Sequence, residues 1–203
     1  MLGSMEDNKL KLGRPVSIDE ISVIKKCLNF YKNNGIHNNS FNDVIKHAGV
    51  SKGTVYRLFG NEDSLQKKTL VEYYNANVKD RILSLEGPNV TLNKVIIAIS
   101  SDIIASKSKP CLYYRSRFDK YKLGPKTKSY LKLLDKKVES AYYSLIKKEL
   151  SNSKKKYTKL QLTNITTFLI NNITTLNLLK LNYASHRTLI NFAKTLQNYF
   201  KNL

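Results

Sequence analysis

The 203-residue sequence predicts an all-α protein of about nine helices, for two main reasons. Apolar residues recur at intervals of three and four along most of the chain, which places them on one face of a helix. Alternating patterns typical of β-strands are short, and glycine, asparagine or proline ends most of the periodic stretches. A chain of this length can bury a sizeable core in one large domain or two small ones.

The first two helices are expected before the glycine turn that ends the second of them. The first is expected over residues 17–34, with Ser17 as its N-cap and Gly35 as its stop signal. The second is expected to begin with Asn39 as its N-cap. It ends at Gly49, which suits a left-handed conformation because glycine has no Cβ.

The remaining helices are predicted from residues that can cap a helix and from residues that end one. Ser51 is expected to cap a third helix that Gly60 closes. Asn61 is expected to cap a longer fourth helix, which keeps its apolar period as far as Leu85. The Glu-Gly-Pro-Asn sequence that follows is the clearest break in the chain. Beyond it, further helices are expected over residues 91–106, 111–121, 126–150, 160–182 and 186–202.

The charge balance points to an anionic partner. The 35 Lys and Arg residues exceed the 15 Asp and Glu residues, so the formal net charge is +20 at pH 7. Nucleic acid is the first candidate, ahead of anionic membrane surfaces and acidic proteins. The alternative is that many of the lysines are simply solvated surface.

The cysteines and the hydropathy pattern indicate a cytoplasmic protein. Cys27 and Cys111 each lie within an apolar helical pattern, not in a closely spaced disulfide framework. The N-terminal segment is polar and no run of about 18 apolar residues occurs, so neither a signal peptide nor a membrane span is expected. Residues 1–4 precede Met5 and are a candidate expression scar.

The segment HAGVSKGTVYRLFG, residues 47–60, predicts a helix-turn-helix. Two short helices joined by a tight glycine turn form this motif, and the capped N-terminal end of the second helix enters the major groove of DNA. A basic arm ahead of the motif can place an arginine in a minor groove. The candidate DNA contacts are Arg14, Ser51, Lys52, Gly53, Thr54, Tyr56 and Arg57.

The residue types in this set suit different parts of DNA. Lys52 and Thr54 are placed to reach bases or phosphates, and Gly53 lets the backbone approach closely. Tyr56 and Arg57 suit the phosphate backbone. Plainer interpretations stay open for each: a solvated face for the two basic residues, packing on the first helix for the tyrosine, and a hydrogen bond within its own helix for the threonine. The arm could equally be a disordered basic tail.

The stretch FNDVIKHAGVSKGTVYRLFGNEDSL, preceded by GRP and a helix of suitable length, resembles the tetracycline-repressor (TetR) family of bacterial transcription regulators. The resemblance covers about residues 13–74 and is most specific in the third helix. It implies a homodimer with a DNA-binding domain and a helical domain that binds a small effector and dimerises. The chain then divides into a basic arm (1–14), a helix-turn-helix domain (15–62), a connecting helix (63–85) and an effector-binding and dimerisation domain (86–203).

Two positions depart from the family pattern. Where the family often has a lysine that touches phosphate, at the start of the fourth helix, this sequence has Glu62 followed by Asp63. These acids suit the helix dipole but repel DNA, so the phosphate contact is expected to be absent or rebuilt by Lys67 or Lys68. Ile45 stands where the family usually has alanine, which leaves the crossing distance of the second and third helices open.

The C-terminal half has no pattern typical of an enzyme or a metal protein. It lacks a phosphate-binding glycine loop, a metal-spaced His/Cys cluster and a nucleophile with a base nearby, so no catalysis, metal or cofactor is expected. Aromatic residues at helical spacing could line an effector cavity, although the plainer interpretation of each is hydrophobic core. The candidates are Tyr113, Tyr114, Phe118, Tyr121, Tyr142 and Phe168.

The last two helices are the expected dimer interface. Packed against their copies in a second chain they would form a four-helix interface, as the resemblance implies. The alternative is that their apolar faces cover only their own core. The expected interface residues are Ile165, Phe168, Leu169, Ile173, Leu176, Leu189, Phe192 and Leu196.

Motif, charge and resemblance together favour a ligand-responsive transcription regulator. We expect a repressor that binds a palindromic operator as a homodimer and is released by a small-molecule effector. The expected partners are double-stranded DNA, a second copy of the chain and an unidentified effector, with no membrane. The alternative is a nonspecific or architectural nucleic-acid-binding protein driven by its positive charge. An enzyme or ligand carrier with a vestigial helix-turn-helix is a third interpretation.

Overall fold

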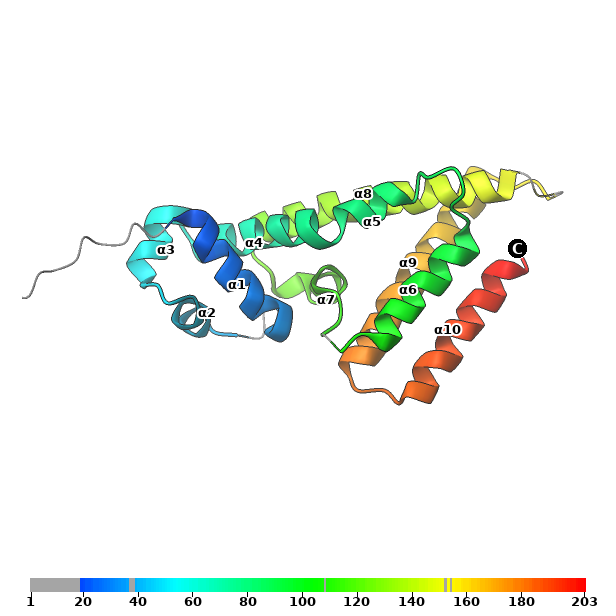
Figure 1. Cartoon of the computed structure of the whole chain (residues 1–203). Coiled ribbons are helices and arrows are strands. Elements are labelled where there is room, and N and C mark those ends of the chain that lie inside the picture. Colours follow the sequence, from blue (N-terminus) through cyan, green and yellow to red (C-terminus); the bar gives the residue numbers. More distant parts are fainter. Residues whose placement is uncertain (1–18, 37–38, 108, 152, 154) are drawn as a thin grey trace, which may run out of the picture.

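The computed structural model describes residues 19–36, 39–107, 109–151, 153 and 155–203, which form α-helices joined by loops (Figure 1). No β-strand occurs among these residues, so the all-α prediction is confirmed. The helices are α1 (Glu20–Asn34), α2 (Phe41–Ala48), α3 (Lys52–Phe59), α4 (Glu62–Asn77), α5 (Lys79–Ser84), α6 (Leu92–Ala105), α7 (Leu112–Phe118), α8 (Pro125–Ser151), α9 (Lys159–Leu181) and α10 (His186–Lys201), with a 3-10 turn, η1 (Lys120–Lys122), after α7.

The described part of the chain has ten α-helices, where about nine were expected. The expected connecting helix divides at Val78, between the end of α4 and the start of α5. Neither proline nor glycine occurs at this position, and the apolar residues keep their helical spacing across it, so the sequence predicted one continuous helix. The helix expected over residues 111–121 ends at Phe118, and its last residues enter η1 instead.

The caps of the first two helices differ from expectation. Asp19 caps α1, and its Oδ1 accepts a 2.8 Å hydrogen bond from the backbone N–H three residues on. The expected cap, Ser17, lies outside the described residues. Ser40 caps α2 in place of Asn39, because it directly precedes the first helical residue and its Oγ accepts a 3.2 Å hydrogen bond from the N–H three residues on. The Asn39 amide instead donates to the carbonyl oxygen of Gly35.

The turn of the helix-turn-helix has the expected local structure. Gly49 is left-handed, with φ 66° and ψ 36°, a conformation that costs a residue with a Cβ about 1 kcal/mol. Ser51 caps α3 and Asn61 caps α4, each through a side-chain oxygen that accepts a hydrogen bond of 3.1 and 2.8 Å, respectively. The predictions made from local sequence are confirmed at these three positions.

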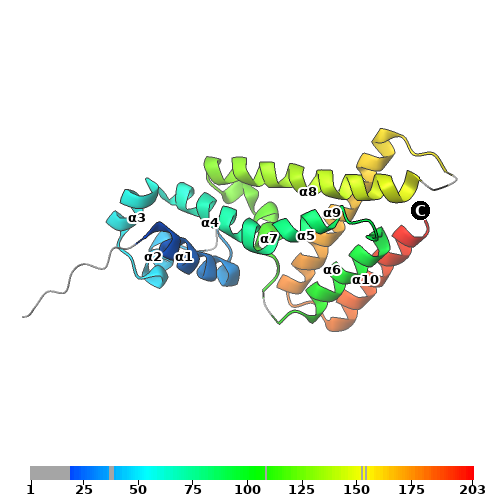
Figure 2. The same ribbon diagram turned by 45° about the horizontal axis from the view of Figure 1, so that its top comes forward.

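The N-terminal and C-terminal helices lie at opposite ends of the molecule. α1, α2 and α3 pack at one end, and α6, α9 and α10 lie side by side at the other (Figures 1 and 2). α4 runs between them beside α8, and α7 packs against α4, α8 and α9. α4 and α7 are therefore the elements that connect the helix-turn-helix to the rest of the chain. Within the described residues, no helix has both the length and the hydropathy needed to span a bilayer.

Polar contacts join α1 and α4 to α7 and α8. Asp63, in the first turn of α4, accepts hydrogen bonds of 2.7 Å from the backbone N–H of Lys126 and 3.0 Å from that of Thr127. The Thr127 hydroxyl donates a further 2.6 Å bond to the same carboxylate. At a second point, the Arg115 guanidinium of α7 donates a 2.9 Å bond to the carbonyl oxygen of Lys32, in the last turn of α1. Both contacts use the unpaired backbone groups found at helix ends.

The Asp63 contact depends on charge and on close approach. Burial alone would raise the pKa of the Asp63 carboxyl, but the hydrogen bonds from Thr127 and Lys126 outweigh burial and hold the pKa below its usual value. A Cβ at Gly124, just before α8, would lie 2.3 Å from Asp63 Cγ. Only glycine at this position leaves room for the carboxylate to approach the first turn of α8.

Candidate nucleic-acid interface

α3 turns its core side inward and its predicted DNA contacts outward. Val55 and Phe59 are buried against the other helices. Of the predicted contacts, Ser51, Lys52, Gly53, Tyr56 and Arg57 are exposed and Thr54 is half-buried. Arg14, the predicted minor-groove contact, lies outside the described residues. The structure thus places six of the seven predicted contacts on α3 and its N-cap, outside the buried core.

Phe41, at the start of α2, supports two of the exposed side chains. The Lys52 ammonium lies 5.9 Å from the centroid of the Phe41 ring, and the centroid of the Tyr56 ring lies 6.2 Å from it. The Tyr56 ring therefore has its neighbour on the second helix, while 47% of the residue stays exposed. The Thr54 hydroxyl shares a 2.9 Å hydrogen bond with Ser51 Oγ. These contacts orient the side chains but leave the ammonium and phenol groups open to a ligand.

The two acids at the start of α4 have different surroundings. Glu62 accepts a 3.0 Å hydrogen bond from Gln66 Nε2. Burial raises the pKa of Glu62, although the Gln66 hydrogen bond and the positive charge of Lys52 act in the opposite direction. Asp63 is hydrogen-bonded to the backbone at the start of α8. Only Glu62 lies near enough to the exposed end of α3 for its charge to interact with that of Lys52.

The two lysines considered as replacement phosphate contacts are also distinguished. Lys68 forms an ion pair with Glu20 of α1, and its ammonium lies 5.5 Å from the centroid of the Phe59 ring. Lys67 is exposed and has no side-chain partner among the described residues. Lys67 is therefore the better candidate for a phosphate contact at the start of α4.

Replacing Glu62 with glutamine should raise the affinity for duplex DNA about threefold at fixed salt. Exposed charges interact by on the order of 0.5–1 kcal/mol, and this change removes one negative charge beside α3. The new side chain keeps an oxygen that can accept the Gln66 hydrogen bond. Fluorescence anisotropy with labelled duplex measures the effect. A Glu86→Gln variant removes an exposed carboxylate elsewhere, and an equal gain in both variants would show that only net charge matters.

Residues 29–67, from the second half of α1 to the first turns of α4, match the family of bacterial regulatory proteins named tetR. This match includes the whole helix-turn-helix described above. The helix-turn-helix region of the chain is thus similar to that of the tetR family. TetR-family proteins are transcriptional regulators that bind DNA, and the helix-turn-helix is their DNA-binding element.

Proteins of known sequence or structure resemble the chain over most of its length. YezE of Bacillus subtilis (strain 168), named an uncharacterized HTH-type transcriptional regulator, is 22% identical over 139 residues, which cover 65% of this chain and 70% of that protein. Reduced NemR of E. coli is 16% identical with a TM-score of 0.65, covering 88% and 95% of the two chains. A TetR-family regulator from Agrobacterium tumefaciens is 10% identical with a TM-score of 0.72, covering 89% and 98%. At these identities the solved structures establish the fold.

The predicted effector residues do not meet in one cavity. Tyr113 and Tyr142 are buried, and the ring of Tyr114 lies 4.9 Å from that of Tyr113. Burial raises the pKa of Tyr142 to about 12, despite the hydrogen bond from Tyr114. Phe118 and Tyr121 are 60% and 68% exposed. Phe168 lies on α9 and packs against α10. As effector contacts these residues stay predictions.

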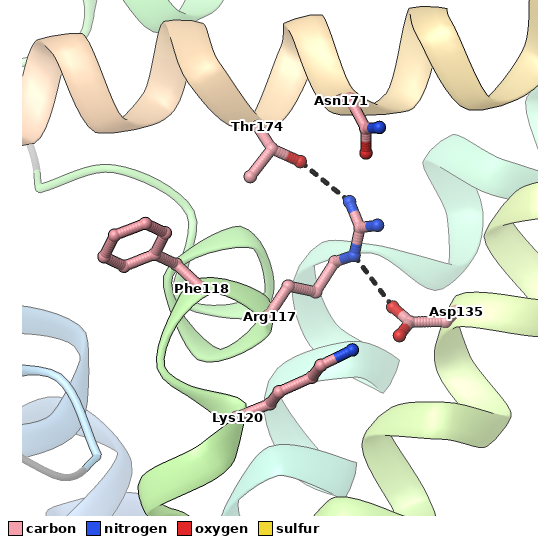
Figure 3. Close-up of a pocket in the computed structure, with 6 residues that line it drawn as sticks. All are labelled: Arg117, Phe118, Lys120, Asp135, Asn171 and Thr174. Atoms are coloured by element: carbon pink, nitrogen blue, oxygen red, sulfur yellow. Dashed lines mark hydrogen bonds and ion pairs between the residues drawn. The ribbon is translucent and has the colours of Figure 1, made fainter.

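A polar pocket lies between α7, η1, α8 and α9 (Figure 3). Its volume is about 250 Å³, and a smaller hollow of about 120 Å³ adjoins it. Sequence reasoning named only one of its residues, because charged side chains on a helix cannot be told from a solvated face without the neighbouring helices. The lining residues are Arg117, Phe118, Lys120, Asp135, Asn171 and Thr174.

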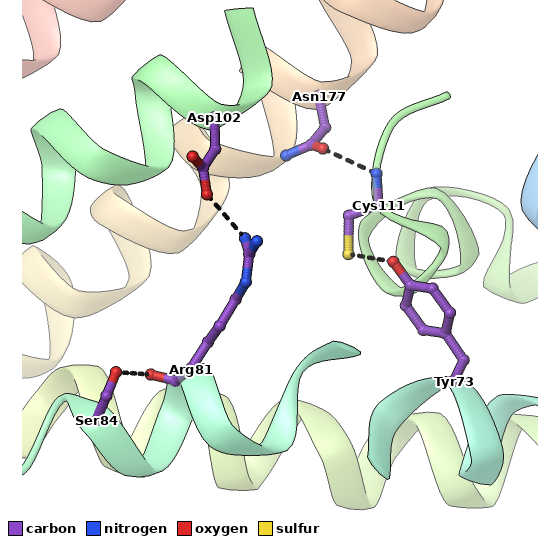
Figure 4. A network of polar contacts seen from close by, with 6 residues as sticks. All are labelled: Tyr73, Arg81, Ser84, Asp102, Cys111 and Asn177. Carbon is purple, nitrogen blue, oxygen red and sulfur yellow. Dashed lines mark hydrogen bonds and ion pairs between the residues drawn. The ribbon is translucent and has the colours of Figure 1, made fainter. Parts of the chain in front are cut away.

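A second group of polar contacts fixes the start of α7 (Figure 4). The Tyr73 hydroxyl of α4 donates to Cys111 Sγ at 3.3 Å and accepts a 3.1 Å bond from the N–H of Leu112. Asn177 of α9 accepts a 3.3 Å bond from the N–H of Cys111. These contacts hold Cys111 in a structural position between α4 and α9. No group of three or more potential metal-ligating side chains occurs among the residues that the structure describes.

The predicted dimer residues divide into buried and exposed sets. Phe168 is 40% exposed and Phe192 is half-buried. The other six are buried within the chain, because α6 and α8 cover the sides of α9 and α10 on which they lie. These six side chains pack inside the chain, which agrees with the alternative interpretation that they cover its own core. They are Ile165, Leu169, Ile173, Leu176, Leu189 and Leu196.

Proposed function

We propose that this protein is a TetR-family, ligand-responsive repressor that binds a palindromic operator as a homodimer and is released by a small-molecule effector. The observation that carries the proposal is the outer side of α3, where Lys52 is exposed next to the capped N-terminus and Tyr56 and Arg57 are exposed further along the helix. Such a helix docks in the major groove, with basic and hydroxyl side chains on bases and phosphates. CifR, which is 12% identical with a TM-score of 0.69, has a structure in complex with 26-bp double-strand operator DNA.

The homodimer is supported by an uncharged surface on α9. Residues 160–179 contain no charged residue, in a chain with 35 Lys and Arg. On this surface the Phe168 ring lies 4.6 Å from that of Tyr199 of α10, and both residues are about two-fifths exposed. Depletion of charge with exposed aromatic rings is typical of the centre of a protein interface. The exposed uncharged polar residues on the two helices include Asn164, Thr167, Thr175, Thr195 and Asn198.

The experiment that tests the proposal is in vitro selection of random duplex DNA by the purified protein at about 150 mM salt. A two-fold dimer should enrich a palindrome whose half-sites are separated by about 34 Å or a multiple of it, one helical turn of DNA. Enrichment of a single half-site would contradict the dimer. Retained binding without enrichment would contradict sequence-specific regulation.

A nonspecific nucleic-acid-binding protein is the second candidate, and the net charge of +20 favours it. It would bind random duplexes with a steep salt dependence and little sequence preference. A specific regulator would instead bind its operator far more tightly than random duplex at the same salt concentration. Measuring both affinities over a range of salt concentrations separates the two functions.

A further inference from the structure

Arg117 is held in the polar pocket in a way that leaves part of its guanidinium group open. Nε lies 3.0 Å from Asp135 Oδ1, and Nη1 donates a 2.7 Å hydrogen bond to Thr174 Oγ1 (Figure 3). The other terminal nitrogen, Nη2, has no protein partner among the described residues. Because the guanidinium group is planar and its donors are fixed relative to one another, the two bonds also set the direction of the free N–H groups.

The carboxylate of Asp135 is also bonded to side chains of the protein. Its Oδ1 also accepts a 2.8 Å hydrogen bond from the buried Tyr113 hydroxyl. Both partners lie on α7, so the Asp135 carboxylate of α8 is held against that helix and serves to position Arg117. Lys120 lines the pocket, and its ammonium group has no ion-pair or hydrogen-bond partner among the residues that the structure describes. The amide of Asn171 faces the same space (Figure 3).

The charge of the lining selects the charge of a ligand. Two cations and one carboxylate line the pocket, which leaves a formal surplus of one positive charge on Arg117, Lys120 and Asp135. One carboxylate group would balance this surplus. A dianion would leave an uncompensated negative charge, and Glu139 of the adjoining hollow would add to the repulsion.

The size of the pocket and its one aromatic residue select the rest of the ligand. A volume of about 250 Å³ lies below the range of drug-sized sites, so a small molecule fits. Phe118 is the aromatic residue of the lining and is 60% exposed. A flat apolar group bound beside its ring would cover surface that water now contacts.

α7 connects this pocket to the helix-turn-helix. Arg115 and Arg117 are two positions apart, which places their side chains about 200° apart around the helix. Arg117 faces the pocket, whereas the buried Arg115 donates to the carbonyl oxygen of Lys32 at the end of α1. A displacement of α7 toward a ligand therefore changes the contact that ends on α1. Such a ligand alters DNA affinity only if it binds one arrangement of α7 better than the other.

We propose that the Arg117–Lys120 pocket binds a small monocarboxylate with an apolar body, and that this ligand changes DNA binding through α7. The effect on DNA binding rests on the proposed function, whereas the binding of the ligand to the pocket does not depend on it. Arg117 and Lys120 hold the carboxylate, Asp135 and Thr174 position Arg117, and Phe118 contacts the apolar body.

Benzoate is the probe for the binding site, with benzamide as its neutral counterpart. Binding is followed by the side-chain Nε–H signal of Arg117 in NMR spectra, assigned by its loss in Arg117→Lys. We expect a saturable shift with benzoate and none with benzamide at equal concentration. Lys120→Gln should weaken benzoate binding about tenfold or more, because it removes the unpaired cation. Lys128→Gln, which removes an exposed charge on α8 outside the lining, should leave the affinity unchanged.

Each contrary result overturns a defined part of the inference. Equal shifts with benzoate and benzamide, or an unchanged benzoate affinity in Lys120→Gln, would overturn the carboxylate site. Phosphate binding as tightly as benzoate would overturn the monoanion class. Benzoate that shifts the Arg117 signal but leaves operator affinity unchanged would overturn the route through α7. Benzoate binding in a protein that selects no operator would overturn the proposed regulator while the site is retained.

Discussion

The double variant Lys52→Ala, Tyr56→Phe is expected to bind operator DNA about thirty- to a hundredfold more weakly than the parent protein. Each side chain is exposed on the outer side of α3, and each can supply one contact to a base or phosphate. Loss of two such contacts corresponds to about 2–3 kcal/mol. Fluorescence anisotropy at fixed salt measures the affinity. The slope of log K against log salt should also fall by about 1, since one phosphate-binding cation is lost.

The fold of this variant should be unchanged, because neither side chain fills the core. The matched control is Lys109→Ala, Tyr183→Phe, which removes the same two functional groups from the loops at the far end of the molecule. Those two residues are exposed and share a 3.0 Å hydrogen bond. Equal operator affinity in the parent, the variant and the control would show that α3 does not make the DNA contacts assigned to it.

Replacing Asp63 with alanine is expected to lower the free energy of unfolding by about 2 kcal/mol at neutral pH. The carboxylate accepts three hydrogen bonds at the first turn of α8, and loss of a single helix cap typically costs 0.5–2 kcal/mol, or more when the acceptor is charged. Urea denaturation followed by circular dichroism measures the loss. Asp80→Ala removes an exposed carboxylate of α5 and serves as the control.

Gly124→Ala tests the same contact without removing the carboxylate. The added Cβ would lie 2.3 Å from Asp63 Cγ, so the carboxylate must withdraw from α8. A loss of stability close to that of Asp63→Ala is expected. If both variants were as stable as Asp80→Ala, the hydrogen bonds at the start of α8 would contribute nothing measurable.

The contribution of Asp63 should depend on pH in a defined direction. Its pKa is lower in the folded protein than the usual value of 3.8, so the unfolded chain binds the proton more readily. The stabilisation is fully present above pH 3.8 and is lost as the pH falls through the folded-state pKa. Denaturation series at neutral and acid pH should show the difference between the parent and Asp63→Ala shrinking below that value. A constant difference would mean that packing, not charge, accounts for it.

Local sequence alone determined the helix-turn-helix and its exposed end. The left-handed glycine at Gly49 and the caps Ser51 and Asn61 act on backbone groups within three residues, so their effects need no knowledge of distant contacts. The spacing of the apolar residues in α3 likewise assigned Val55 and Phe59 to the core. The other side of the helix was therefore predicted to be exposed. These features also carry the family resemblance, which is why the family could be named from the sequence.

The sequence could show that a helix face is apolar, but not which element covers it. The isoleucines and leucines of α9 and α10 suited a dimer as well as a core, and only the structure showed that α6 and α8 pack over these side chains within the chain. The break at Val78 has no local signal, so only the structure located it.

The long-range polar contacts were decided only by the tertiary structure. Asp63 reaches a helix end more than sixty residues away, and Arg117 and Asp135 meet across two helices. The sequence fixes a charged residue on a helix surface, but an ion pair or a cap requires a partner within about 4 Å, and that distance depends on how the helices pack. For this reason the DNA-binding end was predictable from the sequence, whereas the pocket and its connection to that end were not.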